Sequence, residues 1–231
     1  MKRKTSIKTL AARAAMTLLL AVLTATTAWA QEAISGLTYN TAGGYYEIKD
    51  EQDLKDLATY VNAGNDAYGK TFKQTANITF AHTSDWNDTS SDEHNIDGIF
   101  KNFKGSYYGQ GFTISGVRMR FCHGLFYCAY GAVVDGIVLA DSRITNHENT
   151  AGIVGYTYNN IEQGNKPAIV NNCHVRSNVL IHTLGNYQAK QLGGVVGHNA
   201  LGCQITNCTS SATITGHTGS GFRYDIGGIS P

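Results

Sequence analysis

A short pattern recurs along the second half of the chain: an apolar residue, any residue, glycine or asparagine, then another apolar residue. The clearest copies centre on Gly116, Gly136, Asn172 and Asn207. Glycine and asparagine enter the left-handed backbone region at the lowest cost, so each copy predicts a sharp corner between two short strands. A corner that returns at each turn of the chain is typical of a β-solenoid.

A second signature, rich in glycine, accompanies the corners. Its copies lie at residues 124–126, 151–155, 193–197 and 227–229, and their aligned glycines are Gly124, Gly152, Gly194 and Gly228. Together with the apolar alternation, these uneven periods predict an all-β right-handed parallel β-helix, in which the handedness follows from the crossover rule. An antiparallel β-sandwich is the alternative, but it does not need the same corner residue in each repeat.

The segment ahead of the coils predicts a helix. Its apolar residues fall at i, i+3, i+4 and i+7, Asp50 can cap its start and Gly64 can end it. We therefore expect an N-terminal cap at residues 31–74, including a helix at 50–63, followed by β-helix coils at 75–231. Residues 225–231 open a further coil, which we expect to be covered by more chain, by a partner or by self-association.

Residues 1–30 have the pattern of a secretory signal peptide. Basic residues precede a short apolar run at 16–22, and Ala28-Trp29-Ala30 supplies a small-x-small cleavage site. We expect a secreted protein at the outer cell surface or outside the cell, with the periplasm as an alternative. The remaining chain has 13 Lys+Arg and 17 Asp+Glu and no further long apolar run, so we expect neither a transmembrane segment in the mature chain nor a nucleic-acid partner.

The stretch Gly193-Gly-Val-Val-Gly197, followed by Ile205-Thr-Asn-Cys208, resembles the repeats of bacterial secreted and surface proteins that carry the GLUG motif. The resemblance extends over residues 45–231 and includes the coil at 103–116 and the helix. It implies a right-handed β-helix of the pectin-lyase-like superfamily. For function it implies adhesins, surface-layer pieces or modules of larger exported proteins, and it carries over no catalytic residue.

The cysteines fit stacked coils. Cys173 and Cys208 occupy one column in successive coils, where strand spacing places their Cα atoms about 4.8 Å apart, within the range of a disulfide. Stacked inward side chains run parallel, however, and this favours a ladder of free thiols over a bridge. The chain has five cysteines: Cys122, Cys128, Cys173, Cys203 and Cys208. An odd number cannot all pair with one another, so at least one is free or forms an intermolecular bond.

Two pairs of residues are candidates for binding. Tyr156 and Tyr158 lie in a polar stretch that we interpret as a long loop after Gly155, where aromatic rings can grip sugars or protein surfaces. Arg120 and Arg176 share a column in our alignment of the corners. Two strand spacings would separate the two arginines by about 9.6 Å. They form either a ladder that binds an anionic chain or two side chains exposed to solvent.

An enzyme is the alternative. A glycoside hydrolase needs two nearby carboxyl groups, and a lyase needs a base with cations. The carboxylates after Lys101 do not stack as a pair, and the acidic segment 82–98 matches no calcium loop and is expected to be solvated. We therefore expect no catalytic residue, metal or cofactor. The sequence favours an exported β-helix for adhesion, or for binding a glycan or a host or cell-surface protein through its loops, over a polysaccharide lyase or glycoside hydrolase.

Overall fold

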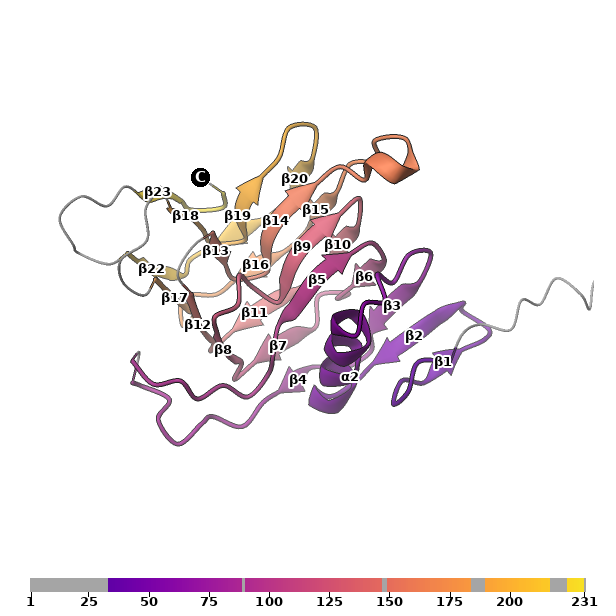
Figure 1. Cartoon of the computed structure of the whole chain (residues 1–231). Helices are drawn as coiled ribbons and strands as arrows, with labels where there is room; N and C mark the ends of the chain where they lie inside the picture. The colour runs from indigo at the N-terminus through magenta and orange to yellow at the C-terminus, as the bar shows by residue number, and fades with distance from the viewer. Residues whose placement is uncertain (1–32, 89, 147–148, 184–189, 217–223, 231) are drawn as a thin grey trace, which may run out of the picture. The chain divides into compact units, whose positions relative to one another are not determined.

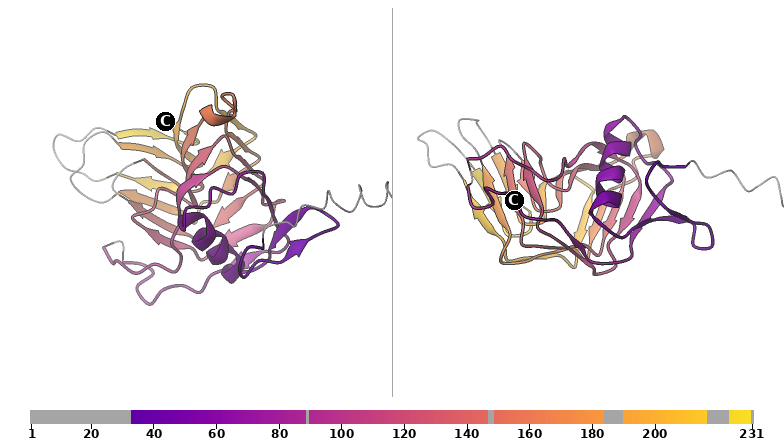
Figure 2. Two further views of the ribbon diagram at one scale, coloured as in Figure 1. Left: turned by 45° about the vertical axis from the view of Figure 1, so that its right-hand side comes forward. Right: turned by 90° about the horizontal axis from the view of Figure 1, so that it is seen from below.

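Short parallel strands stack in register and form a β-solenoid (Figure 1). The computed structural model describes residues 33–88, 90–146, 149–183, 190–216 and 224–230. The signal peptide expected at residues 1–30 lies outside these residues. Each circuit of the chain visits the sheets in the same order, so strands far apart in the sequence lie side by side (Figure 2).

Two sheets form the first part of each circuit. The longer one, called the long sheet below, consists of β1 (Tyr39–Asn40), β2 (Tyr45–Ile48), β3 (Thr71–Gln74), β6 (Ser106–Tyr108), β10 (Val133–Asp135), β15 (Ile169–Asn171) and β20 (Gln204–Thr206). The second sheet consists of β4 (Ile78–Thr79), β7 (Thr113–Ser115), β11 (Val138–Ala140), β16 (His174–Val175) and β21 (Thr209–Ser210). Every pairing within them is parallel except that of β1 with β2.

Three further sheets complete the circuit. The third sheet consists of β8 (Arg118–Arg120), β12 (Arg143–Asn146), β17 (Leu180–Thr183) and β22 (Thr213–Thr215). The fourth consists of β13 (Thr150–Ala151), β18 (Lys190–Gly193) and β23 (Tyr224–Gly227). The fifth, called the aromatic sheet below, consists of β5 (Ile99–Phe103), β9 (Phe126–Tyr130), β14 (Val154–Tyr158) and β19 (Val196–Asn199).

The register of these sheets equals the spacing of the glycine signature. Phe126 pairs with Val154, and this interval is the one that separates the first two aligned glycines. Ala151 pairs with Gly193 at the interval between the second and third glycines, and Gly193 pairs with Gly227 at the interval between the third and fourth. The uneven periods are therefore coils of different length stacked on a common register, and the predicted parallel β-helix is confirmed.

Three of the predicted corner residues stack at one corner. Gly136, Asn172 and Asn207 each follow a strand of the long sheet, with φ angles of 71°, 52° and 54°. Backbone hydrogen bonds join them, because Gly136 N donates to Asn171 O at 3.0 Å and Asn172 N donates to Thr206 O at 3.0 Å. The left-handed conformation that the sequence predicts is present at all three.

Gly116 belongs to a different corner, so its alignment with Gly136 is wrong. Ser115 pairs with Ala140, which places Gly116 beside Asp141 between the second and third sheets. Both residues are left-handed, with φ angles of 73° and 40°. Because two corners of the same coil each require a left-handed residue, the local pattern is the same at both and does not reveal which corner it marks.

The predicted helix is α2 (Glu51–Asn62). The Asp50 side chain caps its N-terminus by accepting a hydrogen bond from Asp53 N at 3.0 Å, an arrangement that contributes about 1 kcal/mol. Its apolar stripe is buried and packs against β5 and β2. The helix connects the parallel neighbours β2 and β3. Residues 31–74, assigned to the cap, therefore also supply three strands of the long sheet, β1, β2 and β3.

Inward side chains form ladders from coil to coil. Ile114, Leu139 and Val175 stack in the second sheet and are at most 2% exposed. Cys173 is fully buried at the turn that precedes β16, and Cys208 follows it in the next coil. All five cysteines carry free thiols. The solenoid core is therefore a set of apolar columns, and side chains between them point outward.

Candidate functional site

Aromatic side chains cover the outward face of the aromatic sheet. Tyr127 and Tyr130 come from β9, Tyr156 and Tyr158 from β14, and His198 from β19. Tyr158 is 40% exposed and the other four are half-buried. Unlike the scattered tyrosines elsewhere, these rings come from three successive coils and lie on one surface.

Tyr156 and Tyr158 lie in a strand, and their assignment to a loop is wrong. Thr157 between them is buried, so the strand alternation continues through both tyrosines. Tyr156 pairs with Cys128 on one side and with His198 on the other. The irregular segment begins only after Tyr158 and includes the short helix η1 (Ile161–Gln163). A strand holds the two rings more firmly than a loop would.

The rings lie close enough to form one surface. Those of Tyr156 and Tyr158 are stacked, with centroids 6.0 Å apart and planes inclined by 16°. Tyr127 lies 5.2 Å from Tyr156, and His198 lies 5.9 Å from each ring of the stacked pair. Aromatic pairs favour such offset and tilted arrangements, which fix the rings relative to one another.

A hollow of about 500 Å³ opens between these rings; we call it the aromatic hollow. It is lined by Asn102, Tyr127, Cys128, Tyr130, Tyr156 and Tyr158. Cys128 is only 3% exposed, and burial raises its pKa to about 12, so the thiol stays neutral. The lining therefore presents ring faces, hydroxyl groups and one amide, with no charge of its own at neutral pH.

Polar contacts hold the edges of the aromatic hollow. Asn149 Nδ2 donates to the Tyr156 hydroxyl at 2.8 Å, and His198 Nδ1 is hydrogen-bonded to Gln191 Oε1. Lys104 Nζ lies 5.5 Å from the ring centroid of Tyr130. The hydrogen bond to Glu162 raises the pKa of Lys104, which keeps this amine protonated. The hollow thus has a cation at one edge and fixed rings at the other.

A glycine of the repeated signature makes room for this arrangement. A Cβ atom on Gly155 would lie 2.4 Å from the Cβ of His123 and 2.8 Å from the carbonyl oxygen of Tyr127. With glycine there, the His123 ring packs 4.8 Å from Tyr127 and 5.3 Å from Tyr156. The same signature that sets the register of the coils therefore also lets the rings approach one another.

Arg120 and Arg176 do not share a column, so the predicted alignment is wrong and the arginine ladder, one of its two alternatives, does not form. Arg120 pairs with Thr145 in the third sheet, whereas Arg176 N donates to Leu139 O at the second sheet. The error follows from the alignment of Gly116 with the wrong corner. Arg120 donates to Ser91 O at 2.7 Å and is ion-paired with Asp92, while Arg176 is exposed.

The sequence reasoning missed a neighbouring arginine. Arg118 is only 5% exposed and donates to the carbonyl oxygens of Asp85 at 2.7 Å, of Glu93 at 2.8 Å and of Asp88. The acidic segment 82–98 is therefore wrapped around a buried guanidinium and is only partly solvated. Within the residues that the structure describes, no group of three His, Cys, Asp or Glu side chains could hold a metal ion.

The carboxylates after Lys101 lie at separate places. Asp135 is in the long sheet and accepts a hydrogen bond from Asn171 Nδ2 at 2.6 Å. Asp141 pairs with His82 at 2.8 Å, and Glu162 pairs with Lys104 at 2.7 Å. Glu148 lies outside the described residues. Glycoside hydrolysis needs two carboxyl groups facing one bond, whereas these three and Asp225 of β23 lie on different sheets and turns.

A family model described as the GLUG motif matches residues 188–215. The described part of that match runs from β18 to β22 and includes both the glycine signature at 193–197 and the corner at 205–208. Comparison with curated proteins and with solved structures gives no match. In the part of the chain that the structure describes, no helix has the length and apolar character needed to cross a membrane.

Proposed function

We propose that this GLUG-motif β-solenoid is an exported module that binds a glycan on its aromatic sheet. The observation that carries the proposal is the stacked, partly exposed pair Tyr156 and Tyr158 beside Tyr127 and His198. Ring faces pack against the apolar C–H faces of sugars, and the hydroxyl and amide groups at the rim can bond to sugar hydroxyls.

The spacing of the solenoid suits an extended chain of sugars. Strands of neighbouring coils lie about 4.8 Å apart, close to the advance of one pyranose ring along an extended glycan. Tyr130 and Tyr158 are paired neighbours in successive coils, so their rings are presented at an interval that lets each meet one sugar. A stiff surface of this kind binds without having to order a loop, which lowers the entropic cost of association.

The leader pattern at residues 1–30 supports export, with the cell surface or the extracellular space as the destination. A host or cell-surface protein is the other class of partner that an aromatic surface can bind. We favour a glycan because the lining of the aromatic hollow is uncharged, hydroxyl-rich and concave, whereas protein partners need about 1,000 Å² or more of buried surface.

The test is a glycan array probed with the processed protein, together with its Tyr156→Ala and Tyr158→Ala variants. We expect each variant to lose affinity about fivefold to tenfold for every glycan that binds, from the ~1 kcal/mol of an aromatic contact. Tyr108→Ala is the matched control, because Tyr108 is a half-buried tyrosine at the end of β6 in the long sheet. It should leave binding unchanged.

Each positive glycan is then incubated with the protein and checked for new reducing ends and unsaturated products. Binding without cleavage supports the proposal. Cleavage would instead assign a lyase or hydrolase to the chain. If no glycan on the array binds, or if both tyrosine variants bind as tightly as the unmodified protein, the proposal is contradicted. A protein partner is then the favoured ligand.

A further inference from the structure

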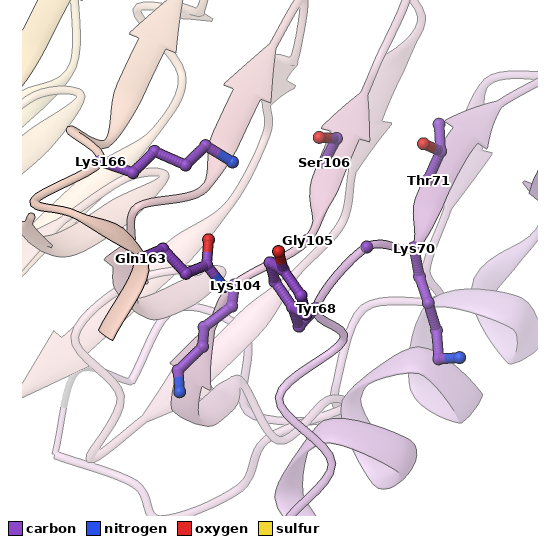
Figure 3. A pocket seen from close by; sticks show the side chains of 9 residues that line it. Tyr68, Lys70, Thr71, Lys104, Gly105, Ser106, Gln163 and Lys166 are labelled. Carbon is purple, nitrogen blue, oxygen red and sulfur yellow. The ribbon is translucent and has the colours of Figure 1, made fainter. Parts of the chain in front are cut away.

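A second pocket, of about 440 Å³, lies at another part of the solenoid surface (Figure 3). We call it the corner pocket. The side chains that matter for its chemistry are Tyr68, Thr71, Lys104, Ser106, Gln163 and Lys166. Nothing in the sequence signature marks these residues, because they come from three turns of different coils.

Stacking of the coils brings these turns together. Thr71 and Ser106 are paired neighbours at the start of β3 and β6, so their hydroxyl groups lie side by side. Tyr68 precedes β3, and Gln163 ends η1. The η1 turn is held over the pocket by the ion pair of Lys104 with Glu162 at 2.7 Å. Lys104 lines the corner pocket, and its ammonium also lies 5.5 Å from the ring centroid of Tyr130 in the aromatic hollow.

Three lysines line the pocket: Lys70, Lys104 and Lys166. Figure 3 shows the Lys70 side chain extending away from Lys166, and the other two differ in their charge balance. Lys104 is compensated by Glu162 and by Asp66 at 3.1 Å. Lys166 is exposed, and none of the described carboxylates lies within ion-pair distance of it. Figure 3 shows the Lys166 side chain extending over the pocket in the direction of Ser106. At Lys166 the pocket therefore presents a positive charge that no described carboxylate neutralises.

The remaining lining suits a sugar. Tyr68 is 57% exposed and offers a ring face, while Thr71, Ser106 and Gln163 offer hydroxyl and amide groups. We propose that the corner pocket binds a single sugar residue that carries a carboxylate, with the carboxylate at Lys166 and the ring on Tyr68. A bare inorganic anion would not use the ring, and a neutral sugar would leave the Lys166 charge without a partner.

The linings of this site and of the aromatic hollow have no residue in common, although Lys104 of the corner pocket also lies near Tyr130. The inference goes beyond the proposed function without depending on it. A neutral glycan on the aromatic hollow and a carboxylated sugar in the corner pocket are different ligands at different places. Where both sites are occupied by one branched glycan, the corner pocket would add a preference for acidic branches.

The probes are glucuronic acid and glucose, which share one ring and differ at the C6 carboxylate. Both are titrated into the processed protein and followed by the backbone amide signals in NMR. We expect glucuronate to bind about tenfold more tightly, equivalent to ~1.4 kcal/mol, and to shift the signals of Thr71, Ser106 and Gln163. Added salt should weaken the binding of glucuronate and leave that of glucose unchanged.

Lys166→Gln should abolish the preference for glucuronate over glucose, whereas Tyr68→Ala should weaken both sugars. Lys101→Gln is the matched control, because Lys101 is an exposed lysine of β5 outside the pocket lining. Unchanged thermal melting shows that each variant is folded. Equal binding of both sugars, a preference retained by Lys166→Gln, or sulfate binding as tightly as glucuronate would each overturn the inference.

The two proposals fail in different ways. If glucuronate shifts only the signals of β14, the corner pocket is not its site, while glycan binding on the aromatic sheet stands. If glucuronate binds at the corner pocket and no glycan binds at the aromatic hollow, the corner pocket is confirmed as a site for carboxylated sugars. Glycan binding on the aromatic sheet is then contradicted.

Discussion

Cys173 and Cys208 occupy the same position in neighbouring coils, since Asn171 pairs with Thr206 before them and His174 with Thr209 after them. Each thiol donates to a backbone carbonyl two residues earlier, Cys173 to Asn171 O at 3.3 Å and Cys208 to Thr206 O at 3.2 Å. Cys173 is fully buried, whereas Cys208 is only partly covered. The neighbouring Cys173 thiol lowers the pKa of Cys208 to about 7, and the interaction with Cys208 together with burial raises the pKa of Cys173. A column of two cysteines thus contains one reactive and one inert sulfur.

The first prediction concerns alkylation by iodoacetamide in a Cys203→Ser background, which removes the other partly exposed thiol. A lowered pKa means more thiolate at neutral pH, so we expect Cys208 to react with a midpoint near pH 7. Burial raises the pKa of Cys122 to about 11 and that of Cys128 to about 12, so both should stay unmodified. Peptide mass mapping across a pH series measures this.

Cys173→Ala is the control for the cause, since it removes the neighbouring thiol and keeps Cys208. The midpoint should then move up towards about 8.5, the ordinary value of a thiol. A midpoint that stays near 7 would show that something other than Cys173 stabilises the thiolate.

The second prediction concerns Arg118. Its replacement by alanine removes the guanidinium that donates to the carbonyl oxygens of Asp85, Asp88 and Glu93, and it leaves Asp85 without its ion pair at 3.5 Å. We expect Arg118→Ala to lower the free energy of unfolding by about 3 kcal/mol. Limited proteolysis should then cut within residues 82–98.

The matched control is Arg176→Ala, because Arg176 is exposed. A change of about 0.5 kcal/mol or less is expected for it. Equal losses for the two variants in urea unfolding, or a segment 82–98 that resists protease after Arg118→Ala, would contradict the role assigned to Arg118.

The fold could be predicted because its determinants are local and repeat. The intervals between the aligned glycines of the signature equal the register of the strands. The paired residues of the fourth and fifth sheets are separated in sequence by the same intervals. The position of Gly116 could not be predicted, because a left-handed residue is needed at both corners of a coil. Because this one corner was misaligned, Arg120 was assigned to the column of Arg176. An error in register therefore misassigns each outward residue whose column was read from that alignment.

The candidate site could be predicted only in part. The sequence identifies Tyr156 and Tyr158, but the polar residues after them suggest a loop, and their strand is fixed by pairing with β9 and β19. His198 was missed, although it follows Tyr156 at the same interval as the third glycine of the signature follows the second. The burial of Arg118 depends on the path of a loop from a preceding coil, and strand alternation alone carries no information about that path.

The third prediction concerns the corner at Asn172, where φ is 52°. Alanine is disfavoured in this region and glycine is not, so Asn172→Ala should destabilise the chain by about 1 kcal/mol while Asn172→Gly should be nearly neutral. Asn178→Ala is the control, since Asn178 is exposed and is not among the left-handed residues. Denaturant midpoints measure all three. If Asn172→Gly loses as much stability as Asn172→Ala, the side chain and not the backbone conformation determines this corner.

The fourth prediction compares two glycines of one column in neighbouring coils. A Cβ atom on Gly194 would lie 2.1 Å from the carbonyl oxygen of Gly228 and 2.1 Å from Ser210 Oγ, whereas a Cβ atom on Gly228 meets none of the described atoms within 4 Å. Neither residue is left-handed, so the difference between them is steric. Gly194→Ala must push the coils apart, at a cost of about 3 kcal/mol, and Gly228→Ala should be tolerated in a protein of residues 31–231.

Hydrogen exchange distinguishes this explanation from a general loss of stability. Separation of the coils at Gly194 breaks the pairing of β18 with β23, in which Leu192 faces Ile226. Amides of these two strands should therefore lose protection in Gly194→Ala, while those of β6 and β10 in earlier coils should keep it. Two results would contradict this explanation: a uniform loss of amide protection over all sheets, or an equal loss of stability in Gly194→Ala and Gly228→Ala. Either would mean that the glycine signature acts through backbone freedom and not through the close approach of successive coils.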